Sequence, residues 1–418
     1  MRALILGRGL SGKGAASLLK SLGFSFSFYQ DGEDIPSLTD FDFAVKSPGI
    51  PINHKILRYL KGEGIPVLGE IELAYRFSRG TIVSITGTNG KSTTTAMIHT
   101  ALKTTNHKTF IGGNFGIPFS EFALSTEDET VSVIELSSFQ IEDLSSYRSD
   151  VSVILNVTPD HLNRYKDFAE YKKAKLRLIK HSDVTLLNRD DEELKGIKGN
   201  NILFFSRKEA ADAFIEKNEL RVKTRRGEIR IPLPELPLKG SHNEENYLAA
   251  ALALSLLGLS ENEILLGLKQ FKGLPHRTEE VAEVKGVRFA NDSKATNPDS
   301  LKKALESFNR VILIAGGSDK GLDFTYLKPL VKEKVKAAVL IGETAELLSK
   351  TFSDVTAVRR APSMEEAVKM AFNLSEEGDT VLLSPGCASF DMFKSFEERG
   401  EAFKEAVLNL KRELEGKS

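Results

Sequence analysis

Short apolar runs alternate with helical patterns along almost the whole chain, and this alternation constrains the fold more than any other feature. Strand-like runs at 3–6 and 81–86, for example, are followed by helical patterns at 13–22 and 94–102. Strands that alternate with helices form parallel sheets with helices packed on their faces. The sequence therefore predicts an α/β fold.

The alternation falls into three sets, and 418 residues exceed what one hydrophobic core usually supports. We expect a Rossmann-like sheet at 1–78, a central sheet with a phosphate-binding loop at 79–274, and a second Rossmann-like sheet at 275–418. Short strand-like pieces around 200–238 indicate a small excursion from the central sheet.

Composition excludes several classes of protein. The 57 Lys and Arg nearly cancel the 58 Asp and Glu, so we expect no nucleic-acid partner. The longest apolar stretch, 247–259, is shorter than the roughly 20 residues of a membrane span, and no membrane insertion is expected. Since the N-terminus lacks a signal-peptide core and Cys387 is the single cysteine, we expect a cytoplasmic protein.

A glycine turn follows the first strand-like run. Gly7, Gly9 and Gly12 have the spacing G-x-G-x-x-G, and Asp31 follows about 20 residues on, as in dinucleotide-binding proteins. The pattern favours an NAD(P)-dependent oxidoreductase. The same turn can receive the pyrophosphate of a UDP-sugar, or can serve only to pack helix on strand.

A second glycine-rich segment, 87–93, lies between a strand-like run and a helical pattern, and it resembles a phosphate-binding loop. Its backbone N–H groups can surround phosphate oxygens, Lys91 can neutralise the β and γ charges, and Ser92 can reach Mg²⁺. Ile85 stands where the general pattern has glycine, so the loop is a variant. The segment predicts ATP binding.

Polar residues follow the next two strands of this set. Glu135 ends one strand and His161 follows another, and ligands bind outside the carboxyl ends of parallel strands. Glu135 can hold Mg²⁺ there; alternatively it serves the cap of the following helix and His161 is an ordinary loop residue. The charge run that contains Lys175 is, by pattern alone, a solvated helix face.

The third set has three polar strand ends, at 291–297, 316–320 and 384–389. Helix capping explains Asn297, which precedes Pro298, but it does not explain Asp292, Lys294 and Thr296. Three polar strand ends on one sheet predict a polar ligand.

Taken together, these segments resemble the Mur ligase family over nearly the whole chain. Within that family the run at 292–297 resembles the branch that adds D-glutamate, and a ligase for another amino acid is the alternative. The segments that carry the resemblance are 87–93, 112–114, 135–140, 156, 160–161, 174–176, 274–277, 291–297 and 384–389.

The resemblance implies an ATP-dependent ligase of peptidoglycan precursor synthesis. Such an enzyme joins D-glutamate to UDP-N-acetylmuramoyl-L-alanine through an acyl phosphate and releases ADP and phosphate. The first glycine turn then receives UDP, so the oxidoreductase reading becomes much weaker. A non-catalytic nucleotide-binding module remains the alternative from another class. We expect a monomer.

The resemblance also implies roles for individual residues. Lys91, His161 and Lys175 are the expected catalytic residues, with Lys175 carbamylated by CO₂. Ser92, Glu135, His161 and the carbamate of Lys175 would hold Mg²⁺, as two ions. The ATP contacts would be Gly87, Thr88, Asn89, Gly90, Lys91, Ser92, Thr93, Asn246 (adenine), Arg277 (phosphate), Asp292 (ribose) and Lys294. The UDP-sugar contacts would be Leu10, Ser11, Asp31, Asn114, Ser137, Gln140 and His161, and the D-glutamate contacts Thr296, Lys320, Ser389 and Phe396.

Overall fold

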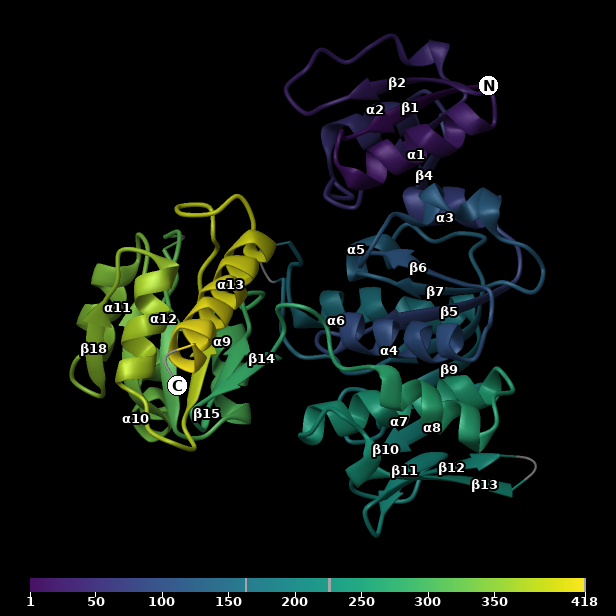
Figure 1. Cartoon of the computed structure of the whole chain (residues 1–418). Helices are drawn as coiled ribbons and strands as arrows, with labels where there is room; N and C mark the ends of the chain where they lie inside the picture. The colour runs from purple at the N-terminus through teal and green to yellow at the C-terminus, as the bar shows by residue number, and fades with distance from the viewer. Residues whose placement is uncertain (162–163, 225–226, 320, 417–418) are drawn as a thin grey trace. The chain divides into compact units, whose positions relative to one another are not determined.

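The computed structural model describes residues 1–161, 164–224, 227–319 and 321–416. The chain divides into two compact units, Met1–Lys272 and Gly273–Ser418 (Figure 1). Within the described residues the strands form three sheets rich in parallel pairs, each with helices packed against it. The predicted α/β class is therefore confirmed, whereas the division of the first unit at residue 78 stays a prediction.

The first sheet is fully parallel, with the strand order β2-β1-β3-β4. Its hydrophobic residues pack on both faces, in one cluster around Ile5 and Val45 and another around Leu4 and Ala44. The elements are β1 (Arg2–Leu6), α1 (Leu10–Ser21), β2 (Ser25–Tyr29), β3 (Phe43–Lys46), α2 (Lys55–Gly62), β4 (Val67–Gly69) and α3 (Glu70–Tyr75).

The helix expected at 13–22 begins earlier, at Leu10, because the extended Gly9 takes the N-cap position. Leu10 and Ser11 therefore lie in the first turn of α1. This places two predicted UDP-sugar contacts at the N-terminus of a helix, where backbone N–H groups lack helical partners.

The second sheet has nine strands in the order β13-β12-β11-β10-β9-β8-β5-β7-β6. Its strands are β5 (Thr81–Thr86), β6 (Thr109–Gly113), β7 (Val131–Glu135), β8 (Ser149–Ile154), β9 (Ser182–Asn188), β10 (Ile202–Ser206), β11 (Ala213–Glu216), β12 (Glu219–Thr224) and β13 (Gly227–Pro232). Its helices are α4 (Lys91–Thr104), α5 (Ser138–Ile141), α6 (Phe168–Leu176), α7 (Ser241–Leu256) and α8 (Glu261–Gln270).

The segment 200–238 does not leave the central sheet, so the small excursion predicted there is wrong. Strands β10 to β13 continue the central sheet instead of leaving it, with β10 parallel to β9 and the hairpin β12–β13 at the edge. The pattern missed this because β12 and β13 carry charged residues on their exposed face. Helix α7 packs across these strands and against α4, so that Tyr247 to Leu254 are all buried.

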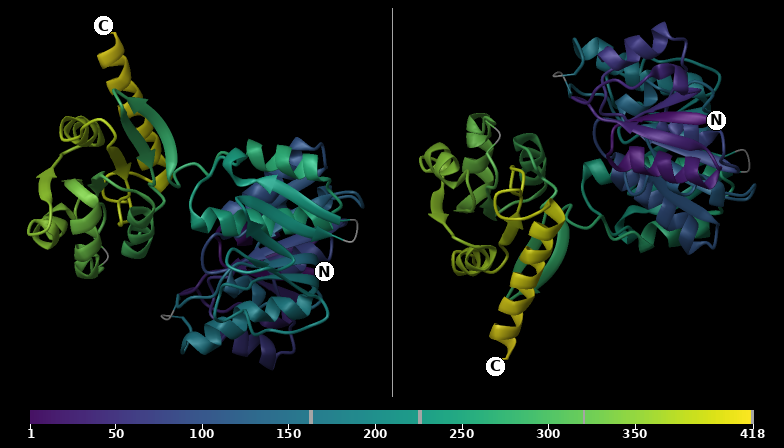
Figure 2. Two further views of the ribbon diagram at one scale, coloured as in Figure 1. Left: turned by 90° about the horizontal axis from the view of Figure 1, so that it is seen from below. Right: turned by 90° about the horizontal axis from the view of Figure 1, so that it is seen from above.

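The third sheet has the order β14-β15-β19-β16-β17-β18, with β14 antiparallel at the edge. Helix α13 lies along β14 and β15 (Figures 1 and 2). The strands are β14 (Glu279–Val284), β15 (Val287–Asn291), β16 (Val311–Ala315), β17 (Val335–Leu340), β18 (Ala357–Arg360) and β19 (Thr380–Leu383). The helices are α9 (Pro298–Ser307), α10 (Lys328–Lys334), α11 (Ala345–Phe352), α12 (Met364–Asn373) and α13 (Phe396–Glu415).

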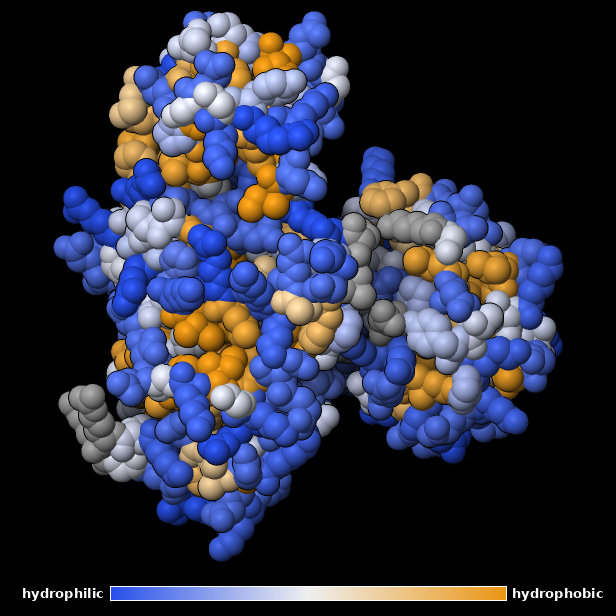
Figure 3. All heavy atoms as spheres, turned by 180° about the vertical axis from the view of Figure 1, so that it is seen from behind, coloured by the Kyte–Doolittle hydropathy of each residue, from blue (hydrophilic) through white to orange (hydrophobic). Residues whose placement is uncertain are grey.

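The outer surface is mainly polar. On the face that Figure 3 shows, hydrophilic residues predominate and smaller hydrophobic areas lie between them. Among the described residues, no helix combines the length and apolar character that crossing a membrane requires.

Candidate active site

The loop 87–93 connects β5 to α4 at the carboxyl end of the central sheet. Gly90 has φ +82°, and a Cβ atom on it would lie 2.5 Å from Asn246 Oδ1, so only glycine fits there. Asn246 is buried in α7 and accepts a hydrogen bond from Thr94 Oγ1 at 3.2 Å. In the described structure this predicted adenine contact therefore packs against the phosphate loop.

Asn156, which follows β8, holds the loop in place. Its Oδ1 accepts from Asn89 N at 2.8 Å and its Nδ2 donates to Asn89 O at 3.2 Å. Thr88 Oγ1 donates to Thr158 O at 3.1 Å, on the same side of the loop. The sequence marked Asn156 only as part of a motif; its place directly after a buried strand was the available signal for this role.

Two lysines converge on one carbonyl oxygen of the loop. Lys91 Nζ donates to Gly87 O at 3.0 Å and to Thr88 O at 3.0 Å, and Lys175 Nζ donates to Gly87 O at 2.8 Å. Lys175 is 2% exposed and lies over the Tyr171 ring. Its burial, and then the charge of Lys91, hold the pKa of Lys175 well below its usual range.

The solvated helix face expected for this charge run is therefore wrong for Lys175. Helix α6 turns Lys175 toward the loop while Lys173 remains exposed. The pattern could not show this, because the apolar residues of α6 do not define one face by themselves.

Glu135 is a buried carboxylate beside the loop. Strand β7 pairs with β5, and Glu135 lies opposite Ile85. Its Oε1 accepts from Asn114 Nδ2 at 2.6 Å, whereas its Oε2 is buried and has no hydrogen-bond partner among the described residues. A buried carboxylate oxygen without a donor suits a cation.

The surroundings of Glu135 fit a magnesium ion that takes only a few of its ligands from the protein. Ser92, in the first turn of α4, is buried in the same loop. Over the described ranges, no three His, Cys, Asp or Glu side chains cluster closely enough to hold a metal. Mg²⁺ commonly takes one or two protein ligands and completes its shell with phosphates and water.

His161 lies on the same side of the sheet, in a left-handed backbone conformation with φ +53°. Its ring centroid is 5.0 Å from that of Phe139, and its Nε2 is 3.6 Å from Asp160 Oδ2. Partial burial is the largest influence on the imidazole and lowers its pKa, opposed by Asp160. The neutral imidazole that accepts a proton or binds a metal is thus favoured at pH 7.

Ser137 and Gln140 form the capping box of α5. Ser137 Oγ accepts from Gln140 N at 3.3 Å, and Gln140 Oε1 accepts from Ser137 N at 2.9 Å. The alternative role of Glu135 in capping this helix is therefore wrong. The predicted sugar contacts of Ser137, Gln140 and Asn114 stay predictions, with all three side chains near the end of β7.

The first glycine turn has the tight geometry that its spacing predicts. A Cβ atom on Gly12 would lie 2.1 Å from Gly7 O. Leu10 is 74% exposed, and the carboxylate of Asp31 lies 3.3 Å from His54 Nε2. The sequence analysis missed Ser47, whose buried hydroxyl adjoins Gly7 and has no partner among the described side chains. Its position directly after β3 was the signal.

In the second unit, Asp292 follows β15 and is buried. Its Oδ1 accepts from Thr278 N at 3.2 Å and its Oδ2 accepts from Ser384 Oγ at 2.9 Å. Burial raises the pKa of Asp292 to about 7, although these hydrogen bonds oppose the rise. The hydrogen bond between Ser384 and Asp292 joins two of the three strand ends predicted to share a ligand, 291–297 and 384–389.

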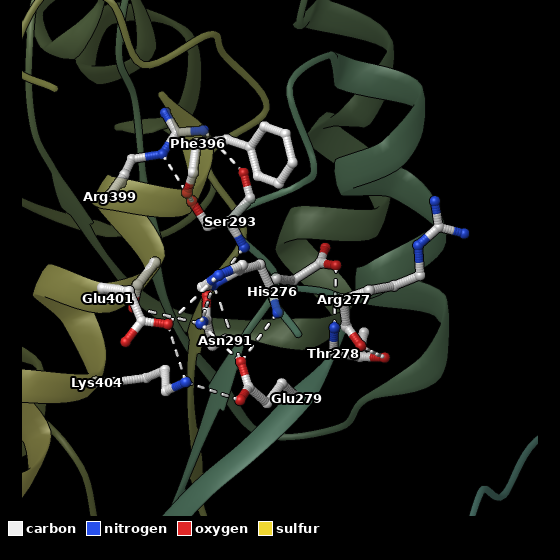
Figure 4. Close-up of polar contacts among 12 residues, drawn as sticks. His276, Arg277, Thr278, Glu279, Asn291, Ser293, Phe396, Arg399, Glu401 and Lys404 are labelled. Atoms are coloured by element: carbon white, nitrogen blue, oxygen red, sulfur yellow. Dashed lines mark hydrogen bonds and ion pairs between the residues drawn. The ribbon is translucent and has the colours of Figure 1, made fainter. Parts of the chain in front are cut away.

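A polar network fixes the turn at 276–278, as Figure 4 shows. Glu279 Oε2 accepts from His276 N at 2.9 Å and from Asn291 Nδ2 at 3.1 Å, and Asn291 Nδ2 lies 3.0 Å from His276 Nδ1. His276 and Thr278 have φ +60° and +45°, so these contacts hold a strained turn. The Arg277 side chain points away from the network (Figure 4).

Arg399 is a buried cation that the sequence analysis missed. Its guanidinium donates to Ser293 Oγ at 3.0 Å, Ser293 O at 2.9 Å and Ala388 O at 3.1 Å. Burial lowers the pKa of Arg399 to about 10. No signal in the charge-rich segment 396–415 distinguishes this arginine.

Some of the residues predicted to bind D-glutamate lie around Arg399. Ser389 is buried next to Ala388, and Phe396 O accepts from Ser293 Oγ at 2.7 Å. Lys294 Nζ is 5.7 Å from the centroid of the Phe396 ring, and Thr296 is half-buried. Lys320 lies outside the described residues.

Comparisons with known proteins identify the family. Residues 85–254 match the Mur ligase middle domain, and residues 276–387 match the glutamate ligase domain of Mur ligases. The UDP-N-acetylmuramoylalanine--D-glutamate ligase of Alkaliphilus metalliredigens is 42% identical over 393 residues, which cover 91% of this chain and 86% of that protein. The enzyme of the same name from Pelotomaculum thermopropionicum is 41% identical, with 98% of each chain covered.

Solved structures show the same fold at lower sequence identity. A pseudomurein peptide ligase type C from Methanothermus fervidus is similar with a TM-score of 0.64 and 19% identity, over 98% of this chain and 100% of that one. UDP-N-acetylmuramate-alanine ligase from Thermotoga maritima is similar with a TM-score of 0.63 and 18% identity, over 98% and 100% of the two chains.

Proposed function

The chain belongs to the Mur ligase family, and from this premise we propose that it joins D-glutamate to UDP-N-acetylmuramoyl-L-alanine at the expense of ATP. It is thus an ATP-dependent ligase of peptidoglycan precursor synthesis. The observation that carries the proposal is the convergence of Lys91 and Lys175 on Gly87 O, beside the unpartnered Oε2 of Glu135. Two lysine side chains and one carboxylate oxygen without a partner suit a phosphate group with its metal ion.

In the first step the terminal carboxylate of the sugar nucleotide attacks the γ-phosphorus of ATP, and ADP leaves. Lys91 stabilises the transferring charge, since its Nζ already lies on the loop that would surround the phosphates. Glu135 and Ser92 would hold Mg²⁺ there. Bound at this position, the ion would neutralise charge on the phosphoryl oxygens.

In the second step the amine of D-glutamate attacks the carbonyl carbon of the acyl phosphate, the amide bond forms and phosphate leaves. The amine proton passes to solvent, or to His161 when that imidazole holds no metal ion. The lowered pKa of His161 supports the role of acceptor, because the imidazole is then neutral at pH 7.

We also propose that Lys175 carries a carbamate. CO₂ reacts with a neutral amine, and burial favours that form of Lys175. The Lys175 nitrogen would bond to the carbon of CO₂ and lose a proton to solvent, and the resulting carbamate would supply an anionic oxygen ligand for the metal. His161 would hold a second ion.

Thr296, Lys320, Ser389 and Phe396 would bind the acceptor, with Arg277, Asp292, Lys294 and Asn246 completing the ATP site. We also propose that the enzyme acts as a monomer and that the reaction takes place in the cytoplasm.

The test is phosphate release from MgATP with UDP-N-acetylmuramoyl-L-alanine, followed by mass analysis of the product. D-glutamate is compared with L-glutamate, several other D-amino acids and no acceptor. We expect phosphate release and a D-glutamyl amide only with D-glutamate. Product with a different amino acid would indicate another ligase of the family, and no amide with any acceptor would contradict ligase activity.

A further inference from the structure

A set of charged side chains outside the phosphate loop joins the first sheet to the central sheet. Lys46, the last residue of β3, is 2% exposed, and its Nζ lies 2.8 Å from Asp143 Oδ2, just after α5. The same Nζ donates to Ile50 O at 3.0 Å. Lysine is almost never buried to this degree without a partner, so this pair holds a fixed position between the two sheets.

Arg164 makes a parallel connection. Its guanidinium lies 3.6 Å from Glu142 Oε2, and its Cζ is 3.9 Å from the centroid of the Phe139 ring. It also donates to Gly49 O at 3.3 Å and to Ile50 O at 3.5 Å, on the loop after β3. We call Lys46, Glu142, Asp143 and Arg164 the inter-sheet clamp.

On one side, the clamp holds the loop 47–50 against the first glycine turn. Ser47 N donates to Leu6 O at 3.1 Å, and a Cβ atom on Gly7 would lie 2.8 Å from Ser47 Oγ. The family resemblance implies that this turn receives the UDP part of the sugar nucleotide, and we take its diphosphate to bind there.

On the other side, the clamp contacts the surroundings of His161, which the proposed function assigns to the reacting end of the substrate. Phe139, under the Arg164 guanidinium, belongs to α5 and packs against His161. Arg164 N donates to His161 O at 2.9 Å, which links Arg164 directly to His161. The clamp therefore connects the two ends of a single elongated ligand site.

We propose that the inter-sheet clamp sets the separation between the diphosphate end and the reacting end of the sugar-nucleotide site, with Lys46 and Arg164 as positioning residues. The proposal rests on the proposed function. A ligand that binds both ends gains affinity when the ends are held at the matching distance, because binding then orders nothing further. A ligand that binds only one end gains nothing from the clamp.

This difference provides the test. Binding of UDP and of UDP-N-acetylmuramoyl-L-alanine is measured by titration calorimetry in the full chain and in Arg164→Gln, Arg164→Lys and Lys46→Met variants. We expect Arg164→Gln and Lys46→Met to weaken the complete substrate about tenfold, the factor that corresponds to about 1.4 kcal/mol, and to leave UDP nearly unchanged. Arg164→Lys keeps the positive charge and should lose less affinity for the complete substrate. The KM for ATP should not change.

Arg148→Gln is the matched control, since it removes an exposed pair with Asp183 in the same unit. Equal weakening of UDP and of the complete substrate would show that the clamp only shapes the diphosphate end, and would overturn the proposal. Unchanged binding of both by folded variants would overturn it as well. Failure of the unmodified protein to bind the sugar nucleotide would instead overturn the proposed function.

Discussion

At the scale of single residues, the site is organised around a charge imbalance. Lys91 and Lys175 both donate to Gly87 O, and one oxygen of the Glu135 carboxylate accepts a hydrogen bond from Asn114. Burial lowers the pKa of Lys175 and the positive charge of Lys91 lowers it further, so the protein alone leaves this arrangement partly unsatisfied. A phosphate anion near Lys91 and a carbamate on Lys175 would each relieve it.

We expect Lys91→Ala to reduce phosphate release by at least roughly 100-fold, because a preorganised charge would be lost where charge develops in the transition state. The fold should remain, since the described Lys91 hydrogen bonds go to two carbonyls of its own loop. Activity and circular dichroism are measured together. Lys103→Ala, exposed on the same helix, is the control. Near-normal phosphate release from the Lys91 variant would contradict the loop assignment.

Lys175 should take up CO₂ at neutral pH. The sign follows from the lowered pKa: the amine loses its proton at a lower pH than an exposed lysine, so more neutral amine is present at pH 7. Protein equilibrated with ¹³C-labelled bicarbonate should give a carbamate carbonyl signal by NMR that Lys175→Met lacks. Lys173→Met, exposed on the same helix, should retain it. A signal that survives in Lys175→Met would place the carbamate elsewhere.

Asp292 should make the stability of the second unit depend on pH. Its pKa is about 7 in the folded chain and roughly 4 when unfolded. The neutral acid is therefore favoured by folding, and its contribution is complete below about pH 4 and is lost as pH rises toward 7. In Asp292→Asn the free energy of unfolding should fall less between pH 4 and pH 7, by a few kcal/mol. Chemical denaturation of both proteins at several pH values between 4 and 8 tests this, and parallel profiles would count against a raised pKa.

At the scale of elements, α13 connects the predicted ATP residues to the predicted acceptor residues. Its first turns carry Phe396, Arg399 and Gly400, which contact Ser293, Ala388 and His276. One helix end thus contacts the turn at 276–278 and two of the three polar strand ends of the third sheet, 291–297 and 384–389. A change at this helix end should therefore affect both stability and substrate binding.

Gly400→Ala tests this connection. An added Cβ atom would lie 2.1 Å from His276 Nδ1, and the network of Glu279 and Asn291 holds His276 in place. Overpacking of this kind destabilises by about 1–3 kcal/mol, and the displaced turn should raise the KM for ATP. Thermal unfolding and kinetics are compared with Gly62→Ala, an exposed helical glycine with open space around it. Wild-type stability and KM in Gly400→Ala would refute the packing argument.

The sequence predicted those site residues whose position follows from one strand. Glu135 ends β7 and Asp292 directly follows β15, at strand ends of the kind where parallel sheets bind ligands. It did not predict Arg399 or the burial of Lys175, because these depend on which side of a helix meets a distant loop. Nor did it predict that β10 to β13 extend the central sheet, since strand pairing is a long-range property.

At the scale of the whole molecule, the predicted ligand sites are distributed unequally over the two units. Every predicted UDP-sugar contact lies within Met1–Lys272, whereas the predicted ATP contacts come from both units, Lys91 from the first and Asp292 from the second. ATP is therefore the ligand that would connect the units. The sugar nucleotide, by contrast, would contact only the first unit, so its binding alone should not connect the units.

We accordingly expect ATP, and not the sugar nucleotide, to bring the two units together before catalysis, because closure would protect the acyl phosphate from water. Small-angle X-ray scattering should show a smaller radius of gyration with Mg²⁺ and a non-hydrolysable ATP analogue, and no change with UDP-N-acetylmuramoyl-L-alanine alone. Arg277→Met, which removes a predicted phosphate contact in the second unit, should bind the analogue more weakly and compact less at equal ligand concentration. If the unmodified chain binds the analogue, as calorimetry would establish, and its radius of gyration stays constant, then ATP does not bridge the units and the second-unit contacts assigned to it are incorrect.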